Sequence, residues 1–354
     1  MRKVIEVTRR HFPINFNCSD LFMRATKDVP VLTDTFECPD DFRPAGNCIY
    51  VFASGGEQRA KHMEKWRAEV DQVRFYEVEE ETLDQFKVKE TGEFVSLRSA
   101  AQMARLWVEL PPDAVIYIDI TGLTHAVWAG LIKSAILEKK RVFAIYVEPD
   151  QYSRSSAPVE GQIYDLSARI QGITPLAGYA VLSPKNNVDF TFVPLLGFEG
   201  TRLRHVIEQV QPGRDRITPV IGSPGFKPWY VFETYLGNRA ALMETEAWQA
   251  VRYAPANCPF SCLYLLEEIA ENSTASSLKV ALVGTKPHAL GAVLFSLISN
   301  TPTELVYDHP VRKPGRTGGI GKLHVYHVAA VFEPTASIYS LADRIGSRRR
   351  QRHD

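Results

Sequence analysis

Two stretches of this chain share one order of hydrophobic and polar positions. In the first, an apolar run over residues 115–120 ends in a glycine turn, and an apolar helical pattern leads on to a second run that ends near Tyr146. In the other, an apolar run ends at Gly284 and the same features end near Tyr307. The glycine-to-tyrosine spacing is 24 residues from Gly122 and 23 residues in the second stretch. Each stretch predicts a strand, a tight turn, a helix and a strand, with the turn at the carboxyl end of a parallel strand.

A second pair of similar segments lies upstream of these stretches. Residues 47–53 form a short apolar run followed by Gly55, and residues 188–196 form another followed by Gly197. A helical pattern begins after each of these turns. Two pairings in the same order indicate an internal duplication. The predicted fold class is α/β, with two tandem Rossmann-like units that have parallel sheets, and ligands of such sheets bind at the carboxyl ends of the strands.

The same patterning divides the chain into five parts. We predict an N-terminal appendage at residues 1–46 and a first Rossmann-like unit at residues 47–150. A linker at residues 151–187 leads to a second unit at residues 188–335, and a C-terminal segment with a basic tail follows at residues 336–354. The linker begins with polar, turn-rich residues that favour an irregular connection. Within the first unit, residues 95–110 have the periodicity of an amphipathic helix, which Pro111 ends.

Composition narrows the class of protein. The chain has 354 residues, of which 45% are hydrophobic and 23% charged, values typical of a soluble protein of two domains. Its formal net charge is zero, so no overall field directs it to nucleic acid or lipid, and direct nucleic-acid binding is left open. No apolar run approaches the roughly 20 residues that span a bilayer, and the N-terminus lacks a secretory signal. We therefore expect a cytoplasmic protein with no membrane partner.

The cysteines favour a reducing compartment and no metal site. They are five in number, which is odd, and none of them forms a Cys-x-x-Cys pair. Cys258 and Cys262 have no neighbouring His or Cys pair, so zinc is not expected. We also expect no cofactor.

The turn at Gly284, Thr285 and Lys286 is the first candidate binding site. It lies between an apolar strand and a helix, and a helix N-terminus offers free N–H groups and partial positive charge to a phosphate. Lys286 adds a full charge, and Pro287 suits a first helical turn. The spacing matches neither the Walker loop nor the GxGxxG dinucleotide fingerprint. We expect Lys286→Ala to weaken nucleotide binding but hardly to change thermal stability, because a helix-start lysine is normally exposed. The alternative is that Thr285 only caps the helix and Lys286 is solvated.

The other strand-to-helix turns supply further candidates. In the first unit, Thr121, Gly122, Thr124 and His125 follow a strand that contains Asp119, an acidic residue that is costly in a core unless it is paired or lies at the ligand edge. A lone histidine at a helix start is more often a surface or capping residue than a catalytic one. The two upstream turns are each followed by a glutamate and an arginine, which either form surface pairs or face ligand phosphates. These four residues are Glu57, Arg59, Glu199 and Arg202.

Residues 312–322 form a glycine-rich basic loop shortly after a predicted strand. Glycines let a backbone approach an anion closely, and the loop carries four cations. We expect it to border the cleft at Gly284, although a mobile hairpin tip with solvated charges is the alternative. The four cations are Arg312, Lys313, Arg316 and Lys322.

The turn pattern resembles the ligand-binding turn of CARF domains, and two such units in one chain resemble the SAVED domain. The resemblance rests on Thr121, Gly122, Thr124, Gly284, Thr285 and Lys286. It implies a Rossmann-like module of prokaryotic antiviral defence that senses a nucleotide or cyclic oligonucleotide and switches an effector. Leu123 and His125 stand where the typical turn has glycine and lysine. No nuclease, TIR, protease or membrane effector is recognisable in the chain, so the resemblance implies a separately encoded protein partner.

Three classes of function remain open. A nucleotide-sensing module requires cations and glycines around a pocket but no nucleophile–base pair. A stand-alone enzyme acting on a nucleotide or phosphodiester requires a general base near the turns, taken from His125, His288, Glu57 or Glu199. A structural subunit of a defence complex requires an extended apolar surface, for which the candidates are Phe226, Trp229 and Tyr230.

Overall fold

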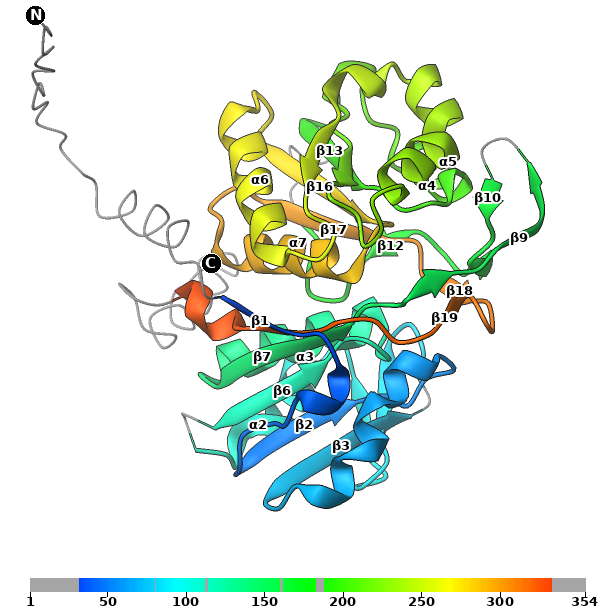
Figure 1. Ribbon diagram of the computed structural model, residues 1–354. Helices are drawn as coiled ribbons and strands as arrows, with labels where there is room; N and C mark the ends of the chain where they lie inside the picture. The colour runs from blue at the N-terminus through cyan, green and yellow to red at the C-terminus, as the bar shows by residue number, and fades with distance from the viewer. Residues whose placement is uncertain (1–31, 80, 112–113, 160–161, 183–187, 333–354) are drawn as a thin grey trace, which may run out of the picture. The chain divides into compact units, whose positions relative to one another are not determined.

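The computed structural model describes residues 32–79, 81–111, 114–159, 162–182 and 188–332. It is a mixed α/β protein with two large sheets whose central strands are parallel, seen as two groups of arrows in Figure 1. Residues 1–31 of the predicted appendage and the C-terminal segment from residue 336 lie outside the described residues.

The first sheet has eight strands in the order β1-β20-β7-β6-β2-β3-β4-β5. Its central strands β7, β6, β2 and β3 are mutually parallel, and the outer strands on both sides pair antiparallel. The strands are β1 (Thr33–Phe36), β2 (Cys48–Phe52), β3 (Val73–Glu79), β4 (Gln85–Val88), β5 (Phe94–Ser96), β6 (Val115–Asp119), β7 (Arg141–Val147) and β20 (Leu323–Tyr326). β2 is buried along its length, as its unbroken apolar sequence predicts for a central parallel strand.

The second sheet has six strands in the order β12-β17-β16-β13-β14-β15. All of its pairings are parallel except that of β12 with β17. The strands are β12 (Thr174–Pro175), β13 (Phe190–Leu195), β14 (Val220–Gly222), β15 (Arg252–Ala254), β16 (Ser277–Leu282) and β17 (Thr303–Tyr307). The predicted parallel strands at residues 116–120 and 280–283 correspond to β6 and β16.

Helices connect the parallel strands of both sheets. They are α2 (Ala100–Val108), α3 (His125–Leu137), α4 (Gly200–Val210), α5 (Tyr230–Glu244), α6 (Pro259–Asn272) and α7 (Lys286–Ile298). α3 and α7 are apolar on nearly all sides and are almost wholly buried, which is the usual setting of such helices. They also contact each other, although they come from different halves of the sequence. The N-terminal ends of both helices lie deep in the protein, since their first residues, His125 and Lys286, are buried.

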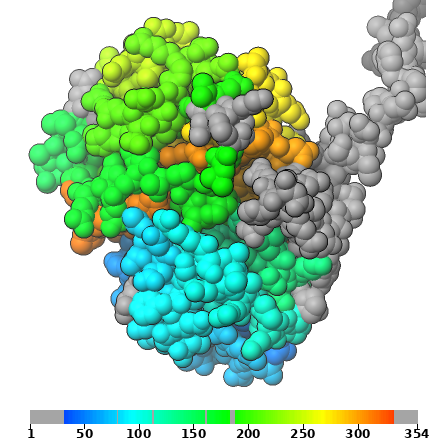
Figure 2. Space-filling model, turned by 180° about the vertical axis from the view of Figure 1, so that it is seen from behind, coloured from blue at the N-terminus to red at the C-terminus, as the bar shows by residue number. Residues whose placement is uncertain are grey.

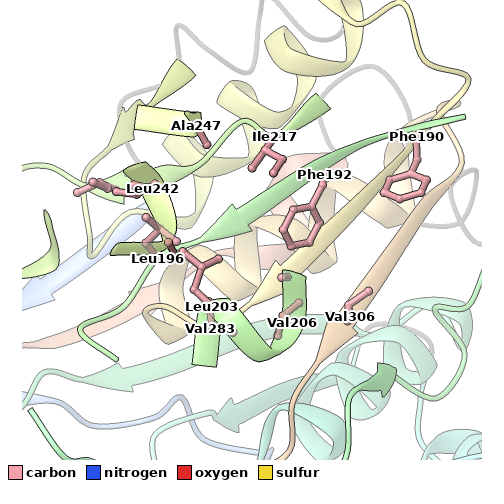
Figure 3. Close-up of a cluster of buried hydrophobic side chains, with 13 residues drawn as sticks. Phe190, Phe192, Leu196, Leu203, Val206, Ile217, Leu242, Ala247, Val283 and Val306 are labelled. Carbon is pink, nitrogen blue, oxygen red and sulfur yellow. The ribbon is translucent and has the colours of Figure 1, made fainter. Parts of the chain in front are cut away.

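The core of the second half lies between its sheet and two covering helices. Phe192 and Val283 from the sheet side pack with Leu203 and Val206 of α4 and Leu242 of α5, as Figure 3 shows. A separate core under the first sheet is rich in aromatic rings, with Trp66 and Tyr50 fully buried. These two cores fix the strand ends from which the turns project.

The helical pattern predicted after Gly55 is present as a helix of the 3₁₀ type, η2 (Gln58–Lys65). Two other local predictions were wrong. Residues 95–110 are not one helix, because β5 occupies their first residues and α2 begins only after Ser99, whose side chain accepts from the Gln102 amide. The stretch 151–182 is not an irregular linker, since it contains the strands β8 (Gln151–Tyr152), β9 (Arg154–Val159), β10 (Gln162–Tyr164), β11 (Ser167–Ile170) and β12.

The chain also crosses the predicted boundaries of its units. β20 lies in the part assigned to the second unit but pairs with β7 and β1 of the first sheet. β18 (Pro310–Arg312) and β19 (Thr317–Gly318) pair with the connecting strands β11 and β8. In Figure 2 the green residues, which include this connecting segment, cover the surface between the cyan residues of the first half and the yellow residues of the second. Among the described helices none is long and apolar enough to cross a bilayer.

Candidate functional site

One cavity brings together the turns of both sheets. It lies where strands β13, β14 and β16 of the second sheet end, at Gly197, Gly222 and Gly284. The first sheet contributes Arg59 and Tyr146 to the lining. This is the edge at which open α/β sheets bind ligands.

The turn glycines allow neighbouring backbones to approach closely. A Cβ atom at Gly284 would lie 2.7 Å from the Leu196 carbonyl oxygen, and one at Gly197 would lie 2.6 Å from that of Val283. At Gly122 the distance to the Ala53 carbonyl oxygen would be 1.9 Å. In each case the chain, rather than a ligand, fills the space where a side chain would project. Glycine at these turns is therefore explained by packing between adjacent turns.

Lys286 is buried rather than exposed. Lys286 is the first residue of α7, and only 6% of it is exposed. Its ammonium donates to the carbonyls of Ile120, Thr121 and Leu123. The distances to the Thr121 and Leu123 carbonyls are both 2.7 Å. Burial, with Arg312 nearby, holds the pKa of Lys286 well below its usual range. The expectation of an exposed lysine was wrong, because three carbonyls of the other half solvate the ammonium inside the protein.

Arg312 binds the same turn of the first half. Its guanidinium donates to the carbonyls of Gly122 and Leu123, each at 3.0 Å. Burial, together with the charge of Arg316, lowers the pKa of Arg312. Two cations of the second half therefore hold residues 120–123 by carbonyl oxygens rather than by carboxylates.

Glu57 is the centre of an ion-pair network beside the cavity. Its carboxylate accepts from Arg59 at 2.7 Å, from Arg316 at 2.6 Å and from the Thr317 hydroxyl at 2.8 Å. Burial opposes its ionisation, but the neighbouring guanidinium groups outweigh this and hold the pKa of Glu57 well below its usual range. The side chains of Arg59 and Glu57 are only 3% and 11% exposed. The surface-pair interpretation of these two residues was therefore wrong.

Glu199 and Arg202 are also occupied within the protein. Arg202 makes a two-pronged pair with Asp308, with both distances at 2.6 Å. Glu199 accepts from the backbone amides of Leu166 and Ser167 at 2.8 and 2.9 Å. Both residues line the cavity while holding neighbouring segments in place.

The cavity lining has more positive than negative charge. Five cations line it, and three of them, Arg59, Arg202 and Arg316, contact a carboxylate. Lys286 and Arg312 bind only backbone carbonyls among the hydrogen bonds formed within the described residues. Uncompensated cations in a partly desolvated cavity favour an anionic ligand.

Aromatic rings form much of the rest of the lining. They are Tyr146, Tyr152, Phe198, Phe226, Tyr230 and Tyr307. Phe198 meets Tyr152 and Tyr230 edge-on, with centroids 5.3 and 5.0 Å apart. Arg59 lies 5.4 Å from the centroid of the Tyr146 ring. Such rings suit the flat faces of a base or another aromatic group.

His125 lies inside this cavity. It is the first residue of α3, which Thr124 caps by accepting from the Val127 amide at 3.4 Å. Its ring lies 4.5 Å from that of Tyr307, and neither ring nitrogen has a partner among the described residues. The interpretation as a surface residue was wrong, because α3 is buried on every side.

The basic loop is divided between the cavity and the surface. Arg312 and Arg316 line the cavity, as expected. Lys313 instead pairs with Asp165, and Lys322 pairs with Glu37 at 2.8 Å and is largely exposed. β18 ends at the first residue of this loop and β19 lies within it, so the first half of the loop is held by pairing to the connecting strands.

Asp119 and the two threonines of the first turn serve that turn. Asp119 accepts from the Thr121 amide at 2.9 Å and pairs with His62 at 2.8 Å. These contacts offset the free-energy cost of burying an acidic side chain in a core strand. Thr121 accepts from the Val147 amide at 3.0 Å, and the Thr124 amide donates to Glu81 at 3.1 Å.

Thr285 performs its capping role at the other turn. Its hydroxyl accepts from the His288 amide at 3.3 Å, and it also donates to the Ala256 carbonyl at 2.8 Å. His288 itself donates from Nε2 to the Pro255 carbonyl. Of the four candidate bases, His125 is therefore the one whose polar atoms have no partner among the described residues.

The apolar surface lies elsewhere than expected. Phe226 and Tyr230 line the cavity, and Trp229 is half-exposed. The larger exposed apolar side chains continue along α5 with Phe232 and Met243. α5 therefore has an outward face of large apolar residues, a pattern that its sequence periodicity does not reveal.

Sequence reasoning missed several lining residues. Tyr152 lies in the stretch predicted as a linker, and no signal in the sequence distinguishes it. Asp308 does not line the cavity but pairs with the lining residue Arg202. It follows the end of a strand, where a polar residue often marks a site, and it could have been found in this way.

A scan of known protein families finds no model that matches the chain, and a search of curated proteins finds no match. No cluster of three or more metal-binding side chains occurs within the described ranges.

Proposed function

We propose that the cavity binds a nucleotide-type ligand through its phosphate groups and that the chain is a sensing module of prokaryotic antiviral defence. The observation that carries this proposal is the pair of cations, Lys286 and Arg312, that bind no carboxylate. They lie in a cavity whose other walls are largely aromatic. A molecule that combines phosphate with a flat base matches both features.

The strand order supports the finer proposal of two duplicated Rossmann-like units. The parallel strands follow the order β7-β6-β2-β3 in the first sheet and β17-β16-β13-β14 in the second. When the four strands of each series are ranked by their position in the chain, the two series have the same spatial order. On this proposal, the ligand lies between two related turns, as in the CARF and SAVED domains that the turn sequences resemble.

Sensing also requires an output, which we assign to a separately encoded protein partner in the cytoplasm. The apolar face of α5 is the candidate contact, because its first residue, Tyr230, lines the ligand cavity.

A stand-alone enzyme acting on a phosphodiester is the second candidate function. It is favoured by His125, a buried imidazole whose ring nitrogens have no hydrogen-bond partner in the described part of the chain.

Native mass spectrometry of the purified protein is the first test, followed by calorimetric titration with the nucleotide that it identifies. Arg312→Gln removes one uncompensated cation and should weaken binding about 10- to 100-fold. Lys322→Gln is the matched control, because it removes a cation of the same loop that lies at the surface. Equal affinities of the two variants would contradict the proposal. Turnover of the bound nucleotide would favour the enzyme.

A further inference from the structure

A buried histidine without a partner lies among the cations of the cavity. His125 is 6% exposed, and both Nδ1 and Nε2 lack a hydrogen-bond partner in the described structure. Buried polar atoms are nearly always paired, so such a ring indicates a missing partner. Since the ring also lines the cavity, a bound molecule is the natural candidate.

We propose that His125 contacts the anionic group of the ligand and takes up one proton as the ligand binds. The inference rests on the proposed function, since it assumes an anion in this cavity. The proton comes from solvent and forms an N–H bond on the ring, and no other covalent bond changes. His125 would then contribute a charge that is present only when the ligand is bound.

The position of the ring is fixed before any ligand arrives. The ring lies between Trp128, at 5.3 Å, and Tyr307, at 4.5 Å between ring centroids. The start of α3, with its N-terminal N–H groups, lies at the same place and favours an anion there. Because these rings cover two sides of the imidazole, an incoming group reaches it from within the cavity.

Charged groups surround the ring from every neighbouring element. The cations are Lys286 of α7, Arg312 of β18, Arg202 of α4 and Arg316 next to β19. The nearby carboxylates already have partners within the protein. Asp308 pairs with Arg202, and Glu57 pairs with Arg59 and Arg316. Glu199 accepts from backbone amides, and Glu81 accepts from the Thr124 amide. Burial and the four cations hold the pKa of His125 well below its usual range, so the ring is neutral in the empty cavity.

An anion reverses this balance. Its negative charge screens the cations and stabilises the imidazolium, and the protonated ring then donates to the anion. By linkage, anion affinity rises as the pH falls, in the range where the ring is neutral when empty and protonated when bound. Lys286 also has a lowered pKa, so a variant that isolates His125 is required.

The test uses inorganic sulfate and the dinucleotide ApA, two anions whose charge is constant across neutral pH. Imidazole proton resonances are titrated with and without each anion, and His125→Gln identifies the signal of interest. We expect the His125 midpoint to rise from well below the ordinary imidazole range to above it when an anion is bound. His288, which is buried outside the cavity lining, is the internal reference and should not move.

Calorimetry supplies a second readout. Between about pH 8 and pH 6 the affinity of the wild type for the anion should rise roughly tenfold, and this dependence should be lost in His125→Gln. A purely structural role would lower affinity equally at both pH values. Anion binding with an unchanged His125 signal would overturn this inference and leave the proposed function standing. If neither anion binds, both fall.

Discussion

Lys286 combines a helix-start position with a buried ammonium, and this makes its removal costly. In Lys286→Met the carbonyls of residues 120–123 lose a charged donor, so we expect the free energy of unfolding to fall by about 1–3 kcal/mol. Anion affinity should fall as well. Chemical denaturation measures the first effect and calorimetry the second. Lys322→Met, at the surface, is the control, and equal stability of the two variants would contradict the prediction.

Glu57→Gln should move stability and anion affinity in opposite directions. The change leaves Arg59 and Arg316 buried without their counter-charge, and we expect a loss of about 3 kcal/mol in the free energy of unfolding. The two freed guanidinium groups then add positive charge to the cavity, so sulfate should bind more tightly. Denaturation curves recorded with increasing sulfate measure both effects. A variant that loses stability without regaining part of it in sulfate would count against this account.

His288 makes the stability of the protein depend on pH. Burial lowers its pKa to about 4, against about 6.5 in the unfolded chain. The unfolded chain therefore binds a proton first, and the free energy of unfolding falls as the pH drops from 6.5 to 4, by about 3 kcal/mol in total from this group. His288→Gln keeps a donor for the Pro255 carbonyl but does not titrate. The stability difference between wild type and variant should shrink over this interval, and a constant difference would refute the assignment.

At the level of single residues, the sequence located the site better than it described it. The turns at Gly122 and Gly284 are identifiable because a glycine after an apolar run marks a strand end. The burial of Lys286 is not, because it depends on three carbonyls about 165 residues away in sequence. Ion pairs such as Arg202 with Asp308 have the same long-range origin.

Among the elements, the pairing of α6 with α7 depends on one glycine. A Cβ atom at Gly291 would lie 2.3 Å from the Pro259 carbonyl oxygen and 2.9 Å from the Cys262 Cβ. Gly291→Ala gains up to about 1 kcal/mol in helix propensity, but the backbone clash outweighs it, and we expect a net loss of about 2 kcal/mol. Thermal or chemical denaturation measures this. Gly172→Ala is the control, since no atom lies within 4 Å of its Cβ position, and a similar loss there would remove the explanation.

The elements that the sequence predicts are those with long apolar runs. β6, α3, β16 and α7 fall where periodicity places them, because their residues are buried in a central position. The strands β8 to β12 were missed because they are short and largely exposed, so no alternation distinguishes them from a loop. β20 was assigned to the wrong sheet, since local sequence does not encode which strand it pairs with.

At the scale of the whole molecule, a strand from late in the chain completes the first sheet and also contacts the second half. β20 lies between β1 and β7, and its Tyr326 hydroxyl donates to the Asn257 carbonyl of the second half at 2.6 Å. A chain ending at residue 309 lacks this strand and leaves an apolar strand edge open. We expect such a chain to aggregate, as measured by light scattering and size-exclusion chromatography. A monomeric fragment with cooperative unfolding would show that the first sheet does not need β20.

The position of β20 also has a consequence for the order in which the protein is made. β1 begins at residue 33, yet its partner emerges from the ribosome only when Leu323–Tyr326 has been synthesised. During most of translation β1 waits unpaired and the β7 edge is open, a stage at which nascent chains are prone to misassociation. The first half to be synthesised is therefore the last to be completed. Its folding is tied to the arrival of residues 323–326.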